Sequence, residues 1–390
     1  MRGSIWIKKL NFTPAMQSSS HPSPRPVAIW VFVGVFMLLV QVILGGITRL
    51  TGSGLSITQW DVVTGVIPPL NPSQWEKAFD GYRQTPQFHI LNSDFSLSEY
   101  KFIFFWEWFH RLWGRLIGVV FLAGFAWFVW KRQMQTWMMR TLLILFVVGA
   151  LQGAVGWIMV LSGLTGDAIY VAPAKLALHF VFALGLIVFT FWFALQLSVP
   201  DKARLIRSPR EPITPVESRL AGRVGLLRRW TIGLLTLLFF QLLYGGLMAG
   251  HRAALVAPTW PDINGSLVPE SLFTQHPLVH DLVGNRLTVQ FIHRTLAYLL
   301  FAGVGGWTFV AIRLAPVPAA FRQLRWLPML FITIQVLLGI ASLLTSPGII
   351  PQRWVVFDWL AEMHQVTGLL FLLLMVGMLY LVVPARTSSV

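Results

Sequence analysis

The stretch Glu107-Trp108-Phe109-His110-Arg111 stands where a long apolar run begins, and Gln290-Phe291-Ile292-His293-Arg294 stands at the start of another. Each histidine has a partner in a later apolar run: His179 follows His110 by 69 residues, and His364 follows His293 by 71. A histidine inside the hydrocarbon of a bilayer is costly and is therefore read first as functional. Two pairs at nearly equal spacing predict two metal or haem sites.

The composition places the chain among integral membrane proteins. Of its 390 residues, 55% are hydrophobic and only 12% are charged, and the mean hydropathy is +0.67. These values are too apolar for a soluble chain of this size. The absence of cysteine excludes disulfides, cysteine-ligated zinc, iron–sulfur clusters and thiolate-bound haem. Any metal ligands must therefore be His, carboxylate or Met.

Eight apolar segments are long enough to cross a bilayer, which needs about 20 helical residues. We expect an all-α integral membrane protein with eight transmembrane helices, arranged as two pseudo-repeated four-helix bundles. The predicted spans are 27–47, 112–130, 141–161, 172–198, 230–250, 288–312, 326–345 and 357–383. The predicted parts are an amino tail (1–26), a first half (27–198), a Pro- and Arg-rich linker (199–229), a second half (230–384) and a carboxyl tail (385–390).

The distribution of positive charge predicts the orientation. The two tails and three alternate connections hold 19 of the 30 Lys and Arg residues, which places them and both termini in the cytoplasm. The loops 48–104 and 251–287 then face outward, where Trp60, Trp75 and Trp260 suit interfacial or folded positions. The first span lacks a cleavage signal, so we expect it to be retained in a bacterial inner membrane. The net charge of +15 forms no basic stripe, which argues against nucleic-acid binding.

Two short motifs support the division into halves. Gln41-Val-Ile-Leu-Gly-Gly46 recurs as Gln241-Leu-Leu-Tyr-Gly-Gly246, and Leu151–Gly156 has an echo in Ile334–Gly339. Each half contributes four spans, so the copies share one orientation, unlike inverted transporter repeats. The paired glycines are expected to allow close approach of a helix or a porphyrin. For Gln152 and Gln335, which lie within spans, we expect hydrogen bonds between helices.

Haem fits the paired histidines better than a bare metal ion does. Zinc usually recruits three or four protein ligands, and a histidine-only copper site typically needs a third donor. Two facing helices that carry one histidine each can hold a haem iron from both sides. We therefore expect His110 with His179, and His293 with His364, to form two bis-histidine sites near the outer surface. The other histidines lie in the tail and outer loops, where solvated roles are expected: His21, His89, His251, His276 and His280.

The two predicted sites differ in one ionisable residue. Glu107 precedes His110 by three residues and shares its helical face, whereas the equivalent residue in the second half is the neutral Gln290. A carboxylate at the haem edge could stabilise developing positive charge or accept a proton. The alternative is a structural ion pair with Arg111 or Arg115. Arg49, Arg111 and Arg294 lie at the outer edge, where haem propionates or lipid headgroups are both plausible partners.

At these residues the chain resembles the haem A synthase family, the CtaA and Cox15-like membrane enzymes, in its branch without loop cysteines. The resemblance covers all eight spans. It is carried by Gly45-Gly-Ile-Thr-Arg-Leu-Thr-Gly-Ser-Gly-Leu-Ser56, Trp60, Gly65, Ile67-Pro-Pro69, Trp75, Phe79, Tyr82, Glu107-x-x-His110-Arg111, Gly114-Arg115 and the later histidines.

The resemblance implies oxidation of the methyl group at ring carbon 8 of haem O to a formyl group, which gives haem A for cytochrome oxidase. By the same resemblance, His110 and His179 would hold the substrate haem, with Glu107 assisting at the reacting methyl. His293 and His364 would hold haem b. A haem O synthase would deliver the substrate, and an electron acceptor would be required.

Two other functions remain compatible with the residues alone. One is a bis-histidine membrane cytochrome for quinol-linked electron transfer, although its haems would be expected on both sides of the membrane. The other is a transporter or chaperone that binds haem without altering it, against which the Glu107 and Gln290 asymmetry argues. The sequence is also compatible with a homo-oligomer.

Overall fold

Every named element of the computed structural model, which describes residues 25–59, 64–200, 203, 205, 215–350 and 353–383, is a helix. Eight of these helices are long and apolar enough to cross a membrane. This confirms the predicted class, an all-α protein with eight membrane-spanning segments. The eight are α1 (Arg25–Leu50), α4 (Leu97–Trp130), α5 (Thr136–Leu161), α6 (Pro173–Ser198), α7 (Pro215–His251), α9 (Arg286–Ile312), α11 (Leu327–Thr345) and α12 (Val356–Val382).

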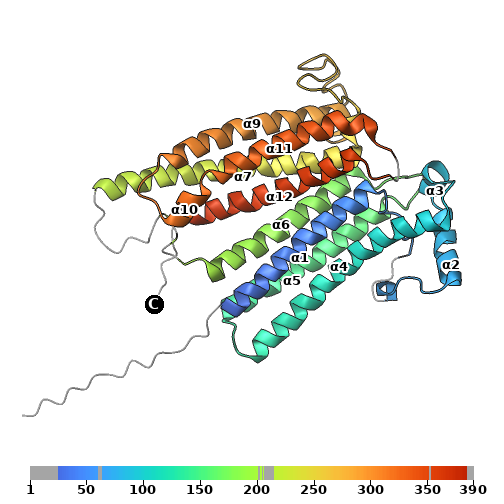
Figure 1. Cartoon of the computed structure of the whole chain (residues 1–390), viewed down its shortest axis with the longest axis horizontal. Coiled ribbons are helices and arrows are strands. Elements are labelled where there is room, and N and C mark those ends of the chain that lie inside the picture. Colours follow the sequence, from blue (N-terminus) through green and yellow to red (C-terminus); the bar gives the residue numbers. More distant parts are fainter. Residues whose placement is uncertain are drawn as a thin grey trace, which may run out of the picture.

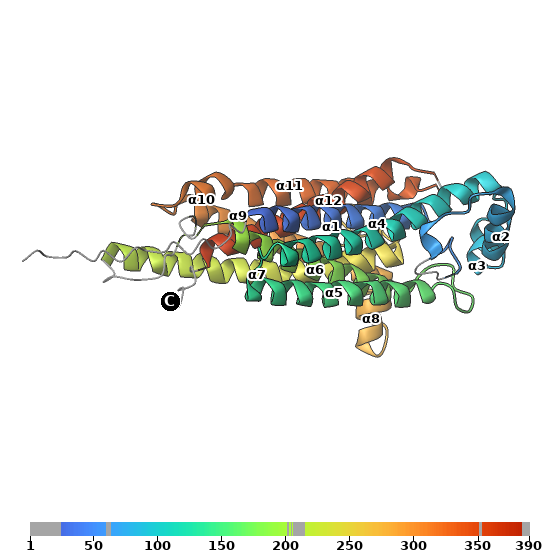
Figure 2. The same ribbon diagram turned by 90° about the horizontal axis from the view of Figure 1, so that it is seen from below.

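The eight helices form two adjacent groups of four (Figure 1). In the first group α1 packs against α4 and α6, and α5 packs against α6. In the second, α9 packs against α7 and α11, and α12 packs against α7 and α11. The arrangement is consistent with two repeated halves. The first helix begins and the last helix ends at the same end of the bundle, opposite the short helices of the outer loops (Figures 1 and 2).

The two halves share one hydrophobic core. It includes Leu184 and Ile187 of α6, Leu234 and Leu238 of α7, and Phe371 of α12, which are all buried. The helices α6 and α7 pack directly, and α12 contacts both α6 and α1. The halves are therefore joined by side chains in contact and not only by the chain that connects them.

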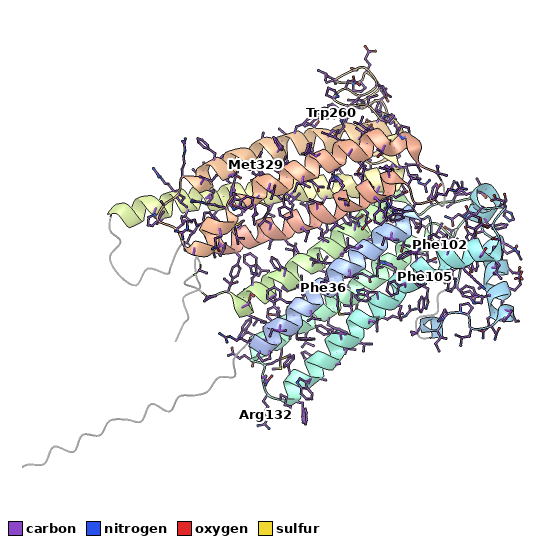
Figure 3. All side chains as sticks on the ribbon, in the orientation of Figure 1. Phe36, Phe102, Phe105, Arg132, Trp260 and Met329 are labelled. Carbon is purple, nitrogen blue, oxygen red and sulfur yellow. The ribbon has the colours of Figure 1, made fainter. Side chains whose placement is uncertain are left out.

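The outward faces of the helices carry large apolar side chains. Phe36 on α1 is 62% exposed, and Phe102 and Phe105 on α4 point away from the bundle (Figure 3). Continuous apolar surface on this scale needs an apolar solvent, which the bilayer provides. The described part of the chain is thus a multi-pass membrane protein.

The first of the two loops that are predicted to face outward folds into a cap on α4. It contains η1 (Thr64–Val66), α2 (Pro72–Arg83) and α3 (Pro86–Leu91). Phe79 stacks on Tyr100 of α4 at 4.8 Å between ring centroids, and Trp75 meets Phe104 edge-on at 5.0 Å. The expectation that Trp75 lies in folded structure is confirmed. Trp60 lies outside the described residues, and Trp260 is 44% exposed in the second loop.

The second outer loop contains η3 (Ala253–Leu255) and α8 (Leu278–Gly284). Short helices also flank α11: α10 (Ala319–Leu324) before it and η4 (Ser346–Gly348) after it.

Helix α4 corrects one predicted boundary. It begins at Leu97, not at 112. Its first turn is closed by a capping box, in which the side chains of Ser96 and Glu99 each accept a hydrogen bond from the backbone N–H of the other residue. The charged residues Glu99, Lys101, Glu107 and Arg111 interrupt the apolar pattern without interrupting the helix. Glu107 and His110 therefore lie inside a continuous 34-residue helix and not at its entrance.

Helix α7 corrects a second boundary. It begins at Pro215, a residue type suited to a first helical turn, so it occupies half of the stretch predicted to be linker. Val224 and Leu227 on this extension are fully buried and belong to the shared core. Four arginines between 219 and 229 conceal this apolar stripe in the sequence.

Candidate functional site

The four predicted histidines lie on four different spanning helices: His110 on α4, His179 on α6, His293 on α9 and His364 on α12. The rings of His293 and His364 face each other, with centroids 6.4 Å apart and planes at 70°. His110 and His179 lie on α4 and α6 of the first half. The structure therefore places two of the predicted histidines in each half and brings the rings of one pair, His293 and His364, together.

A glycine on a neighbouring helix lies against each imidazole. A methyl group built on Gly45 would lie 3.1 Å from His110 Cε1, and one on Gly156 would lie 2.8 Å from His179 Cε1. In the second half, a methyl group built on Gly245 would lie 3.5 Å from His293 Cε1, and one built on Gly339 would lie 2.9 Å from His364 Cε1. The expected close approach at Gly45 and Gly245 is thus an approach to the histidine rings.

The second glycine of each pair serves the contact between halves. A Cβ on Gly246 would lie 2.9 Å from the Ala177 backbone on α6. Gly46 faces Glu362 and Gln365 of α12. These two positions let α7 and α1 approach helices of the opposite half.

The donor set fits a haem iron. With metal–nitrogen bonds of about 2 Å, two imidazoles on opposite sides of one iron have ring centres about 6 Å apart. The separation of 6.4 Å between His293 and His364 agrees with this value. Among the described residues, His, Cys, Asp and Glu side chains do not gather in threes as a bare metal ion would need. Pairs of imidazoles suit an ion whose other ligands come from a porphyrin.

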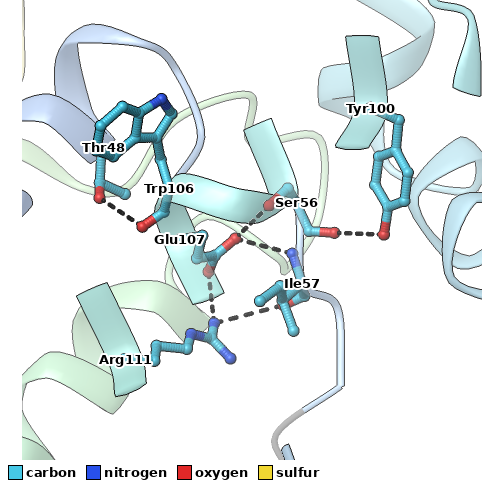
Figure 4. A network of polar contacts seen from close by, with 7 residues as sticks. All are labelled: Thr48, Ser56, Ile57, Tyr100, Trp106, Glu107 and Arg111. Atoms are coloured by element: carbon cyan, nitrogen blue, oxygen red, sulfur yellow. Dashed lines mark hydrogen bonds and ion pairs between the residues drawn. The ribbon is translucent and has the colours of Figure 1, made fainter. Parts of the chain in front are cut away.

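Glu107 is buried, at 2% exposure, and lies at the centre of a polar network (Figure 4). Its Oε2 accepts hydrogen bonds from Ser56 Oγ at 2.7 Å and from the Ile57 backbone N–H at 2.8 Å. Its Oε1 pairs with Arg111 Nη2 at 2.6 Å. The ion pair named as the alternative role is therefore present. Three donors around one carboxylate hold it in a fixed orientation.

Gln290 makes the matching contact in the second half. It is fully buried, and its Nε2 donates to the carbonyl oxygen of Ala257 at 2.9 Å. Ala257 follows α7 in the chain as Ser56 follows α1. Glu107 and Gln290 thus each hydrogen-bond the segment that follows the first helix of their half, but of the two only Glu107 is an acid.

The three outer arginines hold loop and helix-end backbone in this structure. Arg294 donates to the carbonyl oxygens of Thr259, Pro261 and Asp262. Arg49 donates to the Ala249 carbonyl at 3.4 Å. Arg111 is paired with Glu107 as described above. Binding of propionates or lipid headgroups by these arginines stays a prediction.

The interhelical role expected for Gln152 and Gln335 is confirmed. Gln152 Nε2 donates to the His179 carbonyl at 3.1 Å, and Gln335 Nε2 contacts His364 Nε2 at 3.2 Å. Among the other histidines, His251 contacts the Val283 carbonyl at 2.7 Å. His89, His276 and His280 are exposed, and His21 lies outside the described residues.

Glu362 is a buried acid that the sequence analysis missed. It lies on α12 two residues before His364, is 8% exposed, and both of its carboxylate oxygens lack a hydrogen-bond partner. It faces Gly46 across the contact between the halves. Its position inside a predicted span was the available signal, because an ionisable residue in a membrane is a functional candidate.

Comparisons with known proteins identify the family. The family model described as "Cytochrome oxidase assembly protein" (COX15-CtaA) matches residues 28–376. A protein of Rhodopseudomonas palustris named "Heme A synthase" is 40% identical over 377 residues, which cover 96% of each chain. Proteins with the same name are similar in Methylorubrum populi (38% over 368 residues, 93% of this chain and 88% of the relative) and Paramagnetospirillum magneticum (40% over 352 residues, 90% and 92%). The chain therefore belongs to the COX15-CtaA family of cytochrome oxidase assembly proteins.

Proposed function

We propose that this protein is a haem A synthase, which oxidises the methyl group at ring carbon 8 of haem O to a formyl group and so supplies haem A for cytochrome oxidase. The family match and the names of the relatives at about 40% identity support this reaction. The structural observation that carries it is the placing of two partly buried histidines in each half, with a carboxylate held by three donors one helical turn before His110 and a neutral glutamine at the equivalent position before His293.

The first half is proposed as the site of the reaction. His110 and His179 would hold substrate haem O, and Glu107 lies on α4 one helical turn before His110. Conversion of a methyl to a formyl group is a four-electron oxidation that adds one oxygen atom; when water is written as the source of that atom, four electrons and four protons are released. Positive charge develops at the ring edge as electrons leave, and a carboxylate held by Ser56, Ile57 and Arg111 is already oriented to stabilise it.

The second half is proposed as the site of a permanent haem b, held by His293 and His364. When bound, this group supplies a one-electron redox centre. The residue equivalent to Glu107 in this half is the uncharged Gln290, whose amide donates a hydrogen bond to the loop that follows α7. The asymmetry supports a reactive site in one half and an electron-transfer or structural site in the other.

The membrane setting follows from the charge distribution. We place the protein in a bacterial inner membrane with both termini in the cytoplasm and the cap of α2 and α3 outside. A haem O synthase is the proposed supplier of substrate, and the four electrons pass to an acceptor outside this chain.

Pigment extraction tests the proposed reaction. Haem should be extracted from cells with and without this gene, in a host that makes haem O, and resolved by chromatography. Haem A should appear only with the gene, and haem O should accumulate without it. Equal haem A in both strains would contradict the proposal, and a transporter or an electron-transfer cytochrome would leave the haem O to haem A ratio unchanged.

A further inference from the structure

One local pattern occurs four times in the chain. Each spanning helix that precedes a histidine helix carries a glutamine followed four residues later by a glycine. The four copies are Gln41 and Gly45 on α1, Gln152 and Gly156 on α5, Gln241 and Gly245 on α7, and Gln335 and Gly339 on α11. The helices pack in the corresponding pairs α1 with α4, α5 with α6, α7 with α9, and α11 with α12.

In every copy the glutamine amide meets the histidine of the partner helix. The Nε2 atom of Gln41 lies 3.3 Å from both ring nitrogens of His110, and that of Gln152 lies 3.1 Å from His179 Nδ1. Gln241 and Gln335 contact the Nε2 atoms of their histidines at 3.3 Å and 3.2 Å. The glycine lies one helical turn after the glutamine and approaches Cε1 of the same imidazole, so both residues contact one ring.

The histidine helices leave room for the amide. One turn after its histidine, each helix carries a small residue: Gly114, Ala183, Ala297 and Gly368. A Cβ at Gly114 would lie 3.4 Å from Gln41 Nε2, and one at Gly368 would lie 3.0 Å from Gln335 Nε2. Larger residues at these two positions would displace the amide from the ring.

Each of the four glutamines also has a buried amide oxygen without a hydrogen-bond partner. Such oxygens are unfavourable inside a protein unless they serve a ligand or a neighbouring polar group. An amide carries both a donor and an acceptor, and it can therefore satisfy a ring nitrogen in either tautomer of the histidine.

We propose that Gln41, Gln152, Gln241 and Gln335 are positioning residues that, with the adjacent glycines, set the rotation of the four haem-binding imidazoles. The inference rests on the proposed function, because it takes the histidines to be haem ligands. Partners of a metal-binding histidine orient its ring and tune its basicity. The chain then consists of four helix-pair units that each provide one oriented imidazole, and two units enclose each haem.

The pair in the second half gives the clearest readout. The ring planes of His293 and His364 are 70° apart, and nearly perpendicular axial imidazoles give oxidised low-spin haem a strongly anisotropic electron paramagnetic resonance signal. Gln241→Met keeps side-chain length but removes the amide contact on His293, so this ring should turn and the signal should shift towards the rhombic form. In Gln335→Met the His364 ring keeps the contact of its Nδ1 atom with the Gln335 carbonyl oxygen at 3.0 Å, so a smaller shift is expected. The matched control is Gln365→Met, because Gln365 adjoins His364 but bonds the Val42 carbonyl instead.

Spectra of the purified, haem-containing protein decide the outcome. A shifted signal in Gln241→Met, no smaller than the shift in Gln335→Met and with the control like wild type, supports the inference. A wild-type signal in Gln241→Met overturns it. If the glutamine variants do not fold, two glycine variants replace them. The methyl group of Gly339→Ala would lie 2.9 Å from His364 Cε1 and must displace that ring, whereas the methyl group of Gly245→Ala would lie at an ordinary distance of 3.5 Å from His293 Cε1. A larger shift in Gly339→Ala supports the inference, and no shift in either overturns it.

The proposed ligands are tested separately from their positioning. His293→Ala should remove the b-type spectrum. If that spectrum survives, the ligand assignment fails, and with it the proposed haem b site. If it is lost while the glutamine and glycine variants keep the wild-type signal, only the positioning role fails.

Discussion

Arg111 Nη2 lies 2.6 Å from Glu107 Oε1, one turn along the same helix, and the two side chains are only 14% and 3% exposed. This pair fixes the carboxylate beside the proposed substrate site while leaving its charge in place. The pairing does not compete with a role in the reaction, because a carboxylate that is held by three donors is already oriented before substrate binds.

Glu107→Gln should stop haem A formation without emptying the second half. The substitution keeps the shape of the side chain and removes its charge, and loss of one oriented electrostatic group typically lowers a rate by about 10²–10³-fold. The ratio of haem A to haem O in extracted pigment measures the effect. Glu99→Gln is the matched control, since Glu99 caps the same helix at an exposed position. Undiminished haem A from Glu107→Gln would remove the proposed role.

Arg111→Met should destabilise the protein more than the double variant Arg111→Met with Glu107→Gln does. The single change leaves a buried carboxylate without its cation, at a cost of about 1–3 kcal/mol. The double change removes both charges. Thermal unfolding in detergent, compared across the double-mutant cycle, gives the coupling energy. Additive effects of the two changes would show that the ion pair contributes nothing to stability.

His293→Ala should abolish the b-type absorption of the purified protein, because one axial ligand of the proposed haem b is lost. His280→Ala, at an exposed position in α8, should leave the spectrum unchanged. Reduced-minus-oxidised absorption at equal protein concentration provides the comparison. An intact spectrum in His293→Ala would mean that the haem, if present, is held elsewhere.

Gly246→Ala should weaken the contact between the halves. An added methyl group would lie 2.9 Å from the Ala177 backbone on α6, which cannot move as a side chain can, and overpacking of this kind costs about 1–3 kcal/mol. Gly233→Ala on the same helix meets nothing within 4 Å and should be neutral or stabilising by up to about 1 kcal/mol. The melting temperature of Gly246→Ala should therefore be lower than that of Gly233→Ala. Equal melting temperatures would contradict the predicted collision.

Tyr82→Phe should loosen the cap on α4 and reduce its sensitivity to alkali. Tyr82 donates to Gln87 Oε1 at 3.0 Å and accepts from Asn92 Nδ2 at 2.6 Å, so its loss should cost about 1–2 kcal/mol. Burial raises the pKa of Tyr82 to about 12 from its usual 10.

A pKa that is higher in the folded than in the unfolded state gives stability that is complete below pH 10 and lost as the pH rises towards 12. Limited proteolysis of the cap between pH 9 and pH 12 measures both effects. The wild-type cap should open within this interval, and the variant cap should show a weaker dependence on pH. Identical pH profiles would contradict the assignment.

Much of the architecture could be predicted because the membrane imposes it locally. The lengths of the apolar segments predicted all eight spans. The repeated spacing of the histidines predicted which of them form pairs, because each histidine has a fixed position on its own helix. The predicted start of α4 at 112 and of α7 at 230 was wrong because Glu99, Lys101 and the arginines after 215 mask helix that continues beyond the apolar run.

Other features depend on how distant segments meet. That Glu107 bonds Ser56 and Ile57, and that Glu362 faces Gly46, follows from the docking of helices separated by up to about 300 residues in the chain. No local pattern contains that information. The glutamine and glycine positions were visible as echoes in the sequence, but their relation to the histidines appeared only when the helices were placed side by side.

Between Tyr100, on which the cap packs, and His110, helix α4 contains neither glycine nor proline, the residues that most often let a helix bend. The contact with the cap and the His110 imidazole therefore lie on one uninterrupted stretch of helix. A force that tilted the helix at the cap would also move the imidazole, because no bend between them absorbs the motion.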